Sequence, residues 1–311
     1  PQSEVVLGRS GRLFLCCRRT LDDFRRVKTL DDRMLDAWQA MLENRAKWLA
    51  RRDIQYVVLA CPNGQTIYPE HMPRSIKQLD RPSTFDQLIA RLRAGGIVTV
   101  VDPRDELRAA KANREVYYRT DSHWNDYGAY LGYRLLMQQI ARRYPAAAPT
   151  DLDRFTIDES DGPSFGNLAK MVDSPLLLRD HHVRLIPRWQ SRARQKIVRR
   201  PQPGEDNQYF IHVATNPDAT LGAAVVMCDS FFANVMPLFN EHFQTVHYYA
   251  MGRHDKPLPT REIERLHPEV VVHEFVERAL ILYDALDEQS ELIEPESVPY
   301  LAAPIGNTLL R

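Results

Sequence analysis

Short apolar runs rich in β-branched residues recur along the chain. The clearest are IQYVVLAC at 54–61, GAAVVMC at 222–228 and EVVVHEF at 269–275, with a weaker run, GIVTVVD, at 96–102. Their hydrophobicity is nearly continuous rather than alternating, which is typical of strands that are buried on both faces of a parallel sheet. The pattern therefore predicts a strand at each of these four places.

Apolar residues at helical spacing lie between these runs. Residues 30–51 carry apolar side chains at intervals of about three and four. A second helix is predicted at 84–94, and either Ser83 or Thr84 can be its N-cap. Residues 126–143 form a third helical pattern. Strands that alternate with helices predict an α/β sandwich with a mostly parallel sheet, and we expect a single domain over 1–311.

Residues 145–220 interrupt this rhythm. The segment is rich in Pro, Asp and Arg and has no strong helical period, so we predict an insertion of loops and short strands such as HHVRLIPRWQ and QYFIHVAT. It contains a basic run, which is either a solvated surface or a rim that attracts a polyanion. The members of this run are Arg184, Arg188, Arg192, Arg194, Lys196, Arg199 and Arg200.

The global charge points to no partner. Lys plus Arg and Asp plus Glu both number 41 in 311 residues, so nothing favours nucleic acid or an anionic membrane. No apolar run approaches the roughly 18 residues that a membrane-spanning helix needs, so we expect no transmembrane segment. Because the chain begins with Pro rather than Met, we expect that a signal peptide or N-terminal anchor has been removed.

The four cysteines lack the spacing of a zinc knuckle or a CxxC redox pair. Cys61 and Cys228 each end an apolar run, where a small buried side chain packs well, and Cys16 and Cys17 are adjacent. We interpret all four as packing residues, and the sequence assigns no disulfide.

A chemical constellation stands out at YYRTDSHWNDYGAYLGY, residues 117–133. Side chains two residues apart in an extended or turn segment project to the same side, so Asp121 can orient the ring of His123. The partner nucleophile is best sought at VVMCDSFFANVMPLF, where Ser230 follows a predicted strand and precedes an amphipathic helix. Helix N-terminal N–H groups there could hold an oxyanion.

Structural alternatives exist for each residue. Asp121 or Ser122 could cap the helix from 126, with His123 and Trp124 as packing residues, and Asp229-Ser230 could be an N-cap alone. A zinc site made by Asp121, His123 and one further histidine is another alternative, although no HExxH-like spacing supports it. The further histidine would be His181, His182 or His254.

The combination of TDSHW with VVMCDSF resembles the alginate O-acetyltransferase family of the AlgX and AlgJ type, a branch of the SGNH-hydrolase-like proteins. VVLGRSGRLFL near the start, VVLACPNGQTIYPEHMP and EVVVHEFVERAL also resemble segments of that family. The sequence departs from it where Cys228 replaces a small residue and where Asn63-Gly64-Gln65 replaces an Asp-Lys. By this resemblance Ser230 is the nucleophile, His123 the base and Asp121 its orienting acid.

The resemblance also implies further site residues. Gly166 and Asn167 are candidate oxyanion donors, and an ordinary loop turn is the alternative interpretation. Aromatic and basic residues near the motifs could bind sugar or could belong to the core and surface. These substrate-binding candidates are Tyr117, Tyr118, Trp124 and Arg253.

The implied function is transfer of an acetyl group, through an acetyl-serine, to hydroxyls of an exported alginate-like or cellulose-like polysaccharide. The implied location is the periplasm, with acetyl supplied through a membrane-bound O-acyltransferase, and no cofactor or metal is expected. A carbohydrate acetylesterase with the same three residues is the first alternative, because water can replace the sugar. A non-catalytic polysaccharide-binding scaffold and a zinc-dependent deacetylase are the others.

Overall fold

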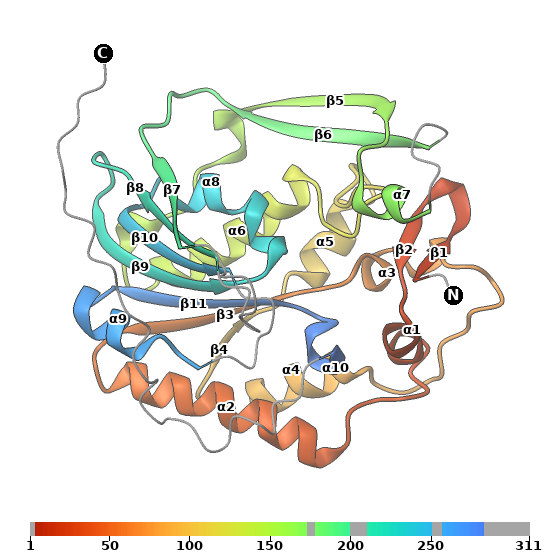
Figure 1. Cartoon of the computed structure of the whole chain (residues 1–311), viewed down its shortest axis with the longest axis horizontal. Helices are drawn as coiled ribbons and strands as arrows, with labels where there is room; N and C mark the ends of the chain where they lie inside the picture. The colour runs from red at the N-terminus through yellow and green to blue at the C-terminus, as the bar shows by residue number, and fades with distance from the viewer. Residues whose placement is uncertain (1–3, 173–177, 200–209, 251–256, 283–311) are drawn as a thin grey trace.

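A seven-stranded sheet forms the centre of the computed structural model (Figure 1), which describes residues 4–172, 178–199, 210–250 and 257–282. The strand order is β4-β3-β11-β9-β10-β8-β7. The first five strands in this order run parallel, whereas β8 is antiparallel to β10 and β7 to β8. The strands are β3 (Gln55–Cys61), β4 (Thr99–Val101), β7 (Arg194–Arg199), β8 (Phe210–Thr215), β9 (Leu221–Cys228), β10 (Phe243–Ala250) and β11 (Val270–Val276).

All four apolar runs are strands of this sheet, and the mostly parallel α/β architecture predicted from them is confirmed. Burial on both faces explains their continuous hydrophobicity. In β3, for example, Val57 and Leu59 belong to one core and Val58 and Ala60 to the other. Each face of the sheet is therefore covered by a hydrophobic layer of its own.

Helices supply these two layers (Figure 1). On one face lie α2 (Asp32–Ala50), α4 (Thr84–Gly95), α9 (Thr260–Leu266) and α10 (Ala279–Leu282). On the other face α6 (Asp126–Ala141) is the longest, with α5 (Arg104–Ala110) and α8 (Met236–Phe239) beside it. Shorter elements are α1 (Arg18–Phe24), α3 (Gly64–Ile67) and the 3₁₀ turns Arg9–Gly11, Pro69–His71, Pro145–Ala147 and Leu152–Arg154.

The three long helices begin at side-chain caps. Asp31 accepts from the Met34 N–H, and Ser83 forms a capping box with Asp86. The cap of α6 is Asn125, whose side chain accepts from the Gly128 N–H. Asp121 and Ser122 therefore do not cap this helix, which leaves them available for another role.

The segment 145–220 is more regular than its composition predicts. It contains β5 (Phe155–Pro163), which pairs with β6 (Arg179–Pro187) over nine residues, and a short helix, α7 (Asn167–Met171), between them. Its later part supplies β7 and β8 of the main sheet. The predicted short strands HHVRLIPRWQ and QYFIHVAT correspond to β6 and β8, which confirms that expectation. The strands β5 and β7 were not predicted, because backbone pairing does not require an apolar pattern.

The described members of the basic run lie on the exposed surface of these strands, and two of them form ion pairs. Arg184 forms an ion pair with Asp158, and Arg192 forms one with Asp218 at 2.8 Å. The exposed Lys196 lies on β7, the outermost strand, separated from β9 by β8 and β10. The side chain of Arg199 and all of Arg200 lie outside the described residues.

A two-stranded hairpin near the start, β1 (Val5–Leu7) with β2 (Leu13–Leu15), packs against α7. It matches the strand pair expected from VVLGRSGRLFL. In the described ranges, no helix is both long enough and apolar enough to cross a membrane.

Candidate active site

Ser230 lies at the carboxyl end of β9, a strand near the middle of the sheet, and its side chain is exposed. The preceding residue, Asp229, fixes the turn. Its N–H donates to Oε2 of Glu274 at 2.9 Å, and its carboxylate accepts from the N–H groups of Phe231 at 2.8 Å and Val276 at 3.0 Å. The turn that presents Ser230 is thereby bound to the neighbouring strand β11.

The chain after Ser230 differs from the predicted amphipathic helix. It is a 3₁₀ turn, Ser230–Asn234, followed by the four-residue α8. Pro237 in the first turn of α8 has no N–H to donate to residue 233, and its ring would clash with the carbonyl there, so one continuous α-helix cannot form. Local N–H groups, rather than the dipole of a long helix, are therefore the available electrostatic feature.

His123 contacts both Ser230 and Asp121. Its Nε2 lies 2.7 Å from Oγ of Ser230, and its Nδ1 lies 2.6 Å from Oδ1 of Asp121. A carboxylate only accepts hydrogen bonds, so Nδ1 carries a proton and Nε2 is free to accept one from the serine hydroxyl. The three side chains thus form a Ser-His-Asp chain of hydrogen bonds at the carboxyl end of the sheet.

Asp121 is held as an anion by several donors. Its Oδ1 also accepts from the backbone N–H of His123 at 3.0 Å, and its Oδ2 accepts from the N–H of Asn167 at 2.7 Å. Partial burial opposes ionisation, but the hydrogen bonds from His123 and Asn167 outweigh it and lower the pKa of Asp121. The carboxylate is therefore ionised and oriented toward the imidazole.

The geometry of Asn167 and Gly166 favours positioning of Asp121 over the expected oxyanion role. The N–H of Asn167 is used by Asp121, and its side chain bridges the N–H and hydroxyl of Ser122 at 3.0 and 2.9 Å. The N–H of Gly166 donates to Oγ of Ser164. A Cβ on Gly166 would lie 2.1 Å from the Thr120 carbonyl oxygen, so the two segments touch backbone to backbone.

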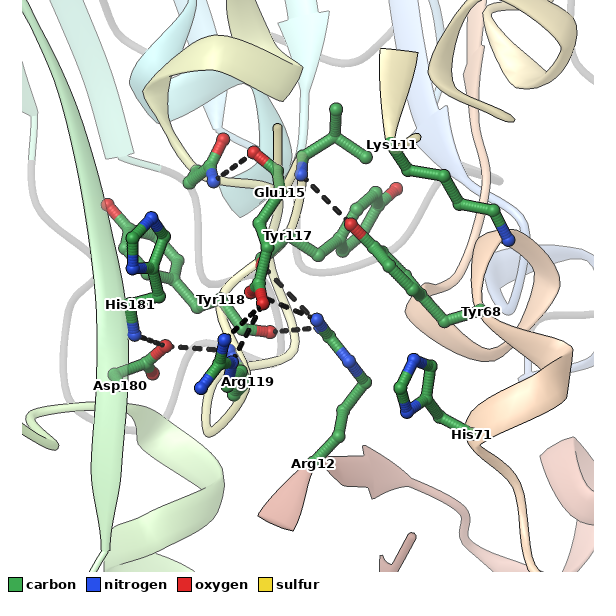
Figure 2. A network of polar contacts seen from close by, with 12 residues as sticks. Arg12, Tyr68, His71, Lys111, Glu115, Tyr117, Tyr118, Arg119, Asp180 and His181 are labelled. Atoms are coloured by element: carbon green, nitrogen blue, oxygen red, sulfur yellow. Dashed lines mark hydrogen bonds and ion pairs between the residues drawn. The ribbon is translucent and has the colours of Figure 1, made fainter. Parts of the chain in front are cut away.

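A polar network fixes the strand-like stretch that leads into Asp121 (Figure 2). Arg12 and Arg119 both donate to Glu115, and Arg12 also donates to the Tyr118 carbonyl at 2.9 Å. Asp180, which is 2% exposed on β6, accepts from the N–H groups of Arg119 and Thr120 at 2.8 and 3.0 Å. The loop that carries Asp121 is thus attached to the N-terminal hairpin and to β6.

Phe231 connects the serine turn to the histidine loop. Its ring lies 4.9 Å from the His123 ring and 5.5 Å from the Trp124 ring, and its carbonyl accepts from the Trp124 indole at 2.9 Å. Trp124 is fully buried and Tyr117 is 1% exposed, with its hydroxyl donating to the Pro62 carbonyl. Neither ring can reach a sugar, which corrects the expectation for Tyr117 and Trp124.

Two kinds of predicted residue remain, the other substrate-binding candidates and the histidines of the alternative zinc site. Tyr118 is half-buried and lies opposite His123, since its N–H donates to the His123 carbonyl at 3.4 Å. Arg253 and His254 lie outside the described residues. Within those residues no group of three or more His, Cys, Asp or Glu side chains is arranged to hold a metal, and His181 instead bridges Asp161 and Glu159.

Sequence reasoning missed three supporting residues. Glu274 is a carboxyl within an otherwise apolar strand, which is itself a signal, and burial together with nearby Asp229 raises its pKa well above the usual range. Phe231 is recognisable only as the residue after Ser230. Asp180 carries no sequence signal, because its partners are backbone N–H groups 60 residues away.

These features define the class of the protein as an α/β/α sandwich of the SGNH hydrolase-like type. The family model described as SGNH hydrolase-like domain, acetyltransferase AlgX, matches residues 5–207, and the chain belongs to this family. The matched region contains Asp121 and His123 and ends before Ser230.

Curated relatives cover part of the chain. The probable alginate O-acetylase AlgJ of Pseudomonas aeruginosa is 34% identical over 125 residues, which are 40% of this chain and 30% of that protein. The AlgJ protein of Azotobacter vinelandii is 29% identical over 129 residues, again 40% of this chain and 30% of the relative. The alignments thus span about a third of the length of these relatives.

Solved structures share the fold over most of the chain. The O-acetyltransferase domain of Pseudomonas putida AlgJ has a TM-score of 0.58 and 20% identity and covers 91% of this chain and 94% of its own. Bacillus cereus PatB1 has a TM-score of 0.64 and 13% identity, with 90% and 98% coverage. At these identities the likeness concerns the fold.

Proposed function

We propose that this protein is a serine-dependent O-acetyltransferase that moves an acetyl group to hydroxyls of a polysaccharide. The observation that carries the proposal is the hydrogen-bonded chain from Ser230 through His123 to Asp121. An exposed serine hydroxyl beside an oriented, proton-accepting imidazole is the arrangement that activates a nucleophile.

The first half-reaction acetylates the enzyme. Nε2 of His123 takes the hydroxyl proton as Oγ of Ser230 attacks the acetyl carbonyl carbon of the donor. The tetrahedral intermediate collapses by breaking the bond to the leaving oxygen, which receives the proton from His123. The product is acetyl-Ser230, and Asp121 stabilises the imidazolium that exists between these two proton transfers.

The oxyanion of this intermediate needs donors that are not otherwise used. Asp229 donates its N–H to Glu274, and Phe231 donates its N–H to the Asp229 carboxylate. The N–H of Ser230 makes no hydrogen bond with a described residue, and we assign it as one donor to the oxyanion. Burial and the neighbouring Asp229 raise the pKa of Glu274 well above its usual range, which opposes a second negative charge beneath this turn.

The second half-reaction consumes a sugar. His123 accepts the proton of an acceptor hydroxyl, whose oxygen attacks the acetyl carbon of acetyl-Ser230. Collapse releases the sugar acetate and returns the proton to Oγ. Water in place of the sugar would give an esterase, so acceptor binding decides between the two outcomes.

The names of the relatives, probable alginate O-acetylases, support an alginate-like acceptor. From the family resemblance of the sequence motifs we further propose that the polymer is exported, with a cellulose-like polymer as the alternative, that the reaction takes place in the periplasm, and that a membrane-bound O-acyltransferase partner supplies the acetyl group. The curated relatives are much longer than the aligned region, so these assignments belong to the proposal.

The test follows acetyl from donor to acceptor. The wild type should release the chromophore from an acetyl ester, gain the mass of one acetyl group, and lose it faster when short alginate or cellulose oligosaccharides are added. Ser230→Ala should lose both turnover and adduct, whereas Ser75→Ala, an exposed serine in a surface turn, should retain both. Equal turnover by wild type and Ser230→Ala would contradict the proposal, and transfer to water alone would identify an esterase.

A further inference from the structure

Phe165 is the most exposed large hydrophobic residue among those described, at 70%. It lies between β5 and α7, directly before Gly166 and Asn167, the two residues packed against the Asp121 loop. Burial of a phenylalanine side chain stabilises a fold, and Phe165 does not contribute in this way because its ring faces solvent. The stability of the fold therefore does not explain why the Phe165 ring is exposed.

Two other rings extend this surface. The Phe165 ring centroid lies 6.3 Å from that of His182, and the His182 centroid lies 6.3 Å from that of Tyr118. His182 is held in place because its Nε2 contacts the Pro163 carbonyl at 3.1 Å, and its ring packs over Gly162, where a side chain would crowd it. We refer to Tyr118, His182 and Phe165 as the aromatic wall.

The aromatic wall adjoins the reacting residues at both ends. Tyr118 is hydrogen-bonded through its backbone to His123, and its side chain lies near Asn234, which is on the same 3₁₀ turn as Ser230. At the other end, Phe165 is two residues from the Asn167 N–H that donates to Asp121. A sugar on this wall would therefore lie beside the segments that carry Ser230, His123 and Asp121.

We propose that the aromatic wall is the acceptor subsite, on which a pyranose ring of the polysaccharide stacks while one of its hydroxyls faces His123. The apolar C–H face of a pyranose matches an aromatic face, and a few polar groups then fix its orientation. Tyr117 and Trp124 are buried, so the wall takes the role first expected of them. This inference rests on the proposed transferase function.

The central experiment truncates Phe165. Its exposure means that Phe165→Ala should fold with unchanged thermal stability. Acetylation of Ser230 by a chromogenic ester without acceptor should proceed at the wild-type rate, while the KM for oligosaccharide acceptors rises about 3- to 10-fold. Phe165→Tyr should restore the wild-type KM, and Ile186→Ala, a half-exposed residue on the same hairpin, should not change it.

Binding without turnover separates this proposal from the proposed function. Saturation-transfer NMR with alginate and cellulose oligosaccharides on Ser230→Ala should show ring protons of the sugar in contact with aromatic protein protons, and adding Phe165→Ala should abolish the signal. That result supports the subsite even if no acetyl transfer is found. An unchanged KM in Phe165→Ala, an equal change in Ile186→Ala, or an unchanged NMR signal would overturn it.

Discussion

The backbone N–H of Asn167 donates a hydrogen bond of 2.7 Å to Oδ2 of Asp121, across 46 positions of sequence. The other oxygen of the carboxylate accepts from two donors of His123. The segment between β5 and β6 therefore orients the acid of the candidate triad. This relationship makes the site dependent on a region whose sequence indicates only an insertion of loops and short strands.

Asp121→Asn should strongly reduce turnover of a chromogenic acetyl ester. An amide cannot stabilise the imidazolium and favours the wrong tautomer of His123, so we expect kcat to fall roughly 10³- to 10⁴-fold. Steady-state kinetics with circular dichroism will measure the effect. Asp105→Asn, at a fully exposed position on α5, is the control, and a matching fall there, or none at Asp121, would refute the role.

Gly166→Ala should damage activity more than an ordinary Gly→Ala change. The new Cβ would meet the Thr120 carbonyl oxygen and carbon at 2.1 and 2.4 Å, and backbone atoms cannot rotate away. We expect displacement of the Asp121 loop and at least a roughly tenfold loss of kcat, consistent with misplacement by an ångström. Gly95→Ala is the control and should leave kcat unchanged, because the atom nearest to its new Cβ is the flexible end of the Glu43 side chain.

Glu277→Gln should flatten the pH dependence of stability. Glu277 is buried and accepts from the Asn63 N–H and the Thr66 hydroxyl, and burial is the main cause that raises its pKa to about 7. Because the folded pKa exceeds the ordinary 4.5, its contribution is complete below pH 4.5 and is lost as pH rises through 7.

Urea unfolding across this pH range provides the measurement. The wild type should lose free energy of unfolding relative to Glu277→Gln, by on the order of 1 kcal/mol per pH unit between pH 4.5 and 7. Glu264→Gln, a half-exposed carboxyl on α9, should follow the wild type. Parallel curves for wild type and Glu277→Gln would show that Glu277 does not control this slope.

Thiol titration should detect one readily reacting cysteine. All four cysteines are unpaired; Cys16, Cys61 and Cys228 are buried, and Cys17 is partly exposed. Burial raises the pKa of Cys16 to about 12 and raises those of Cys61 and Cys228 well above the usual range, so these thiols should be inert in the native state. Native protein should therefore react at Cys17 only, and Cys17→Ser should react at none.

Much of the fold was predictable because its signals are local. The strands β3, β9 and β11 are continuous apolar runs, and Ser83 is an N-cap residue that predicts the start of α4. The spacing of Asp121 and His123 and the position of Ser230 after a strand made these residues candidates, and the family resemblance of TDSHW and VVMCDSF favoured a triad over a helix cap or a zinc site. The strands β5 and β7 escaped prediction because edge and surface pairing leaves little apolar pattern.

The sequence by itself determined the two-sided sheet and its long helices, because hydrophobic period and capping chemistry are local properties. Its motifs also selected the three residues of the candidate triad, through their resemblance to a known family. Only the tertiary structure decided which rings face solvent. In the folded protein Tyr117 and Trp124 are buried and Phe165 is exposed. The N–H of Asn167 donates to Asp121 and is therefore not available to an oxyanion. Such outcomes depend on contacts between segments far apart in the chain, which no local pattern encodes.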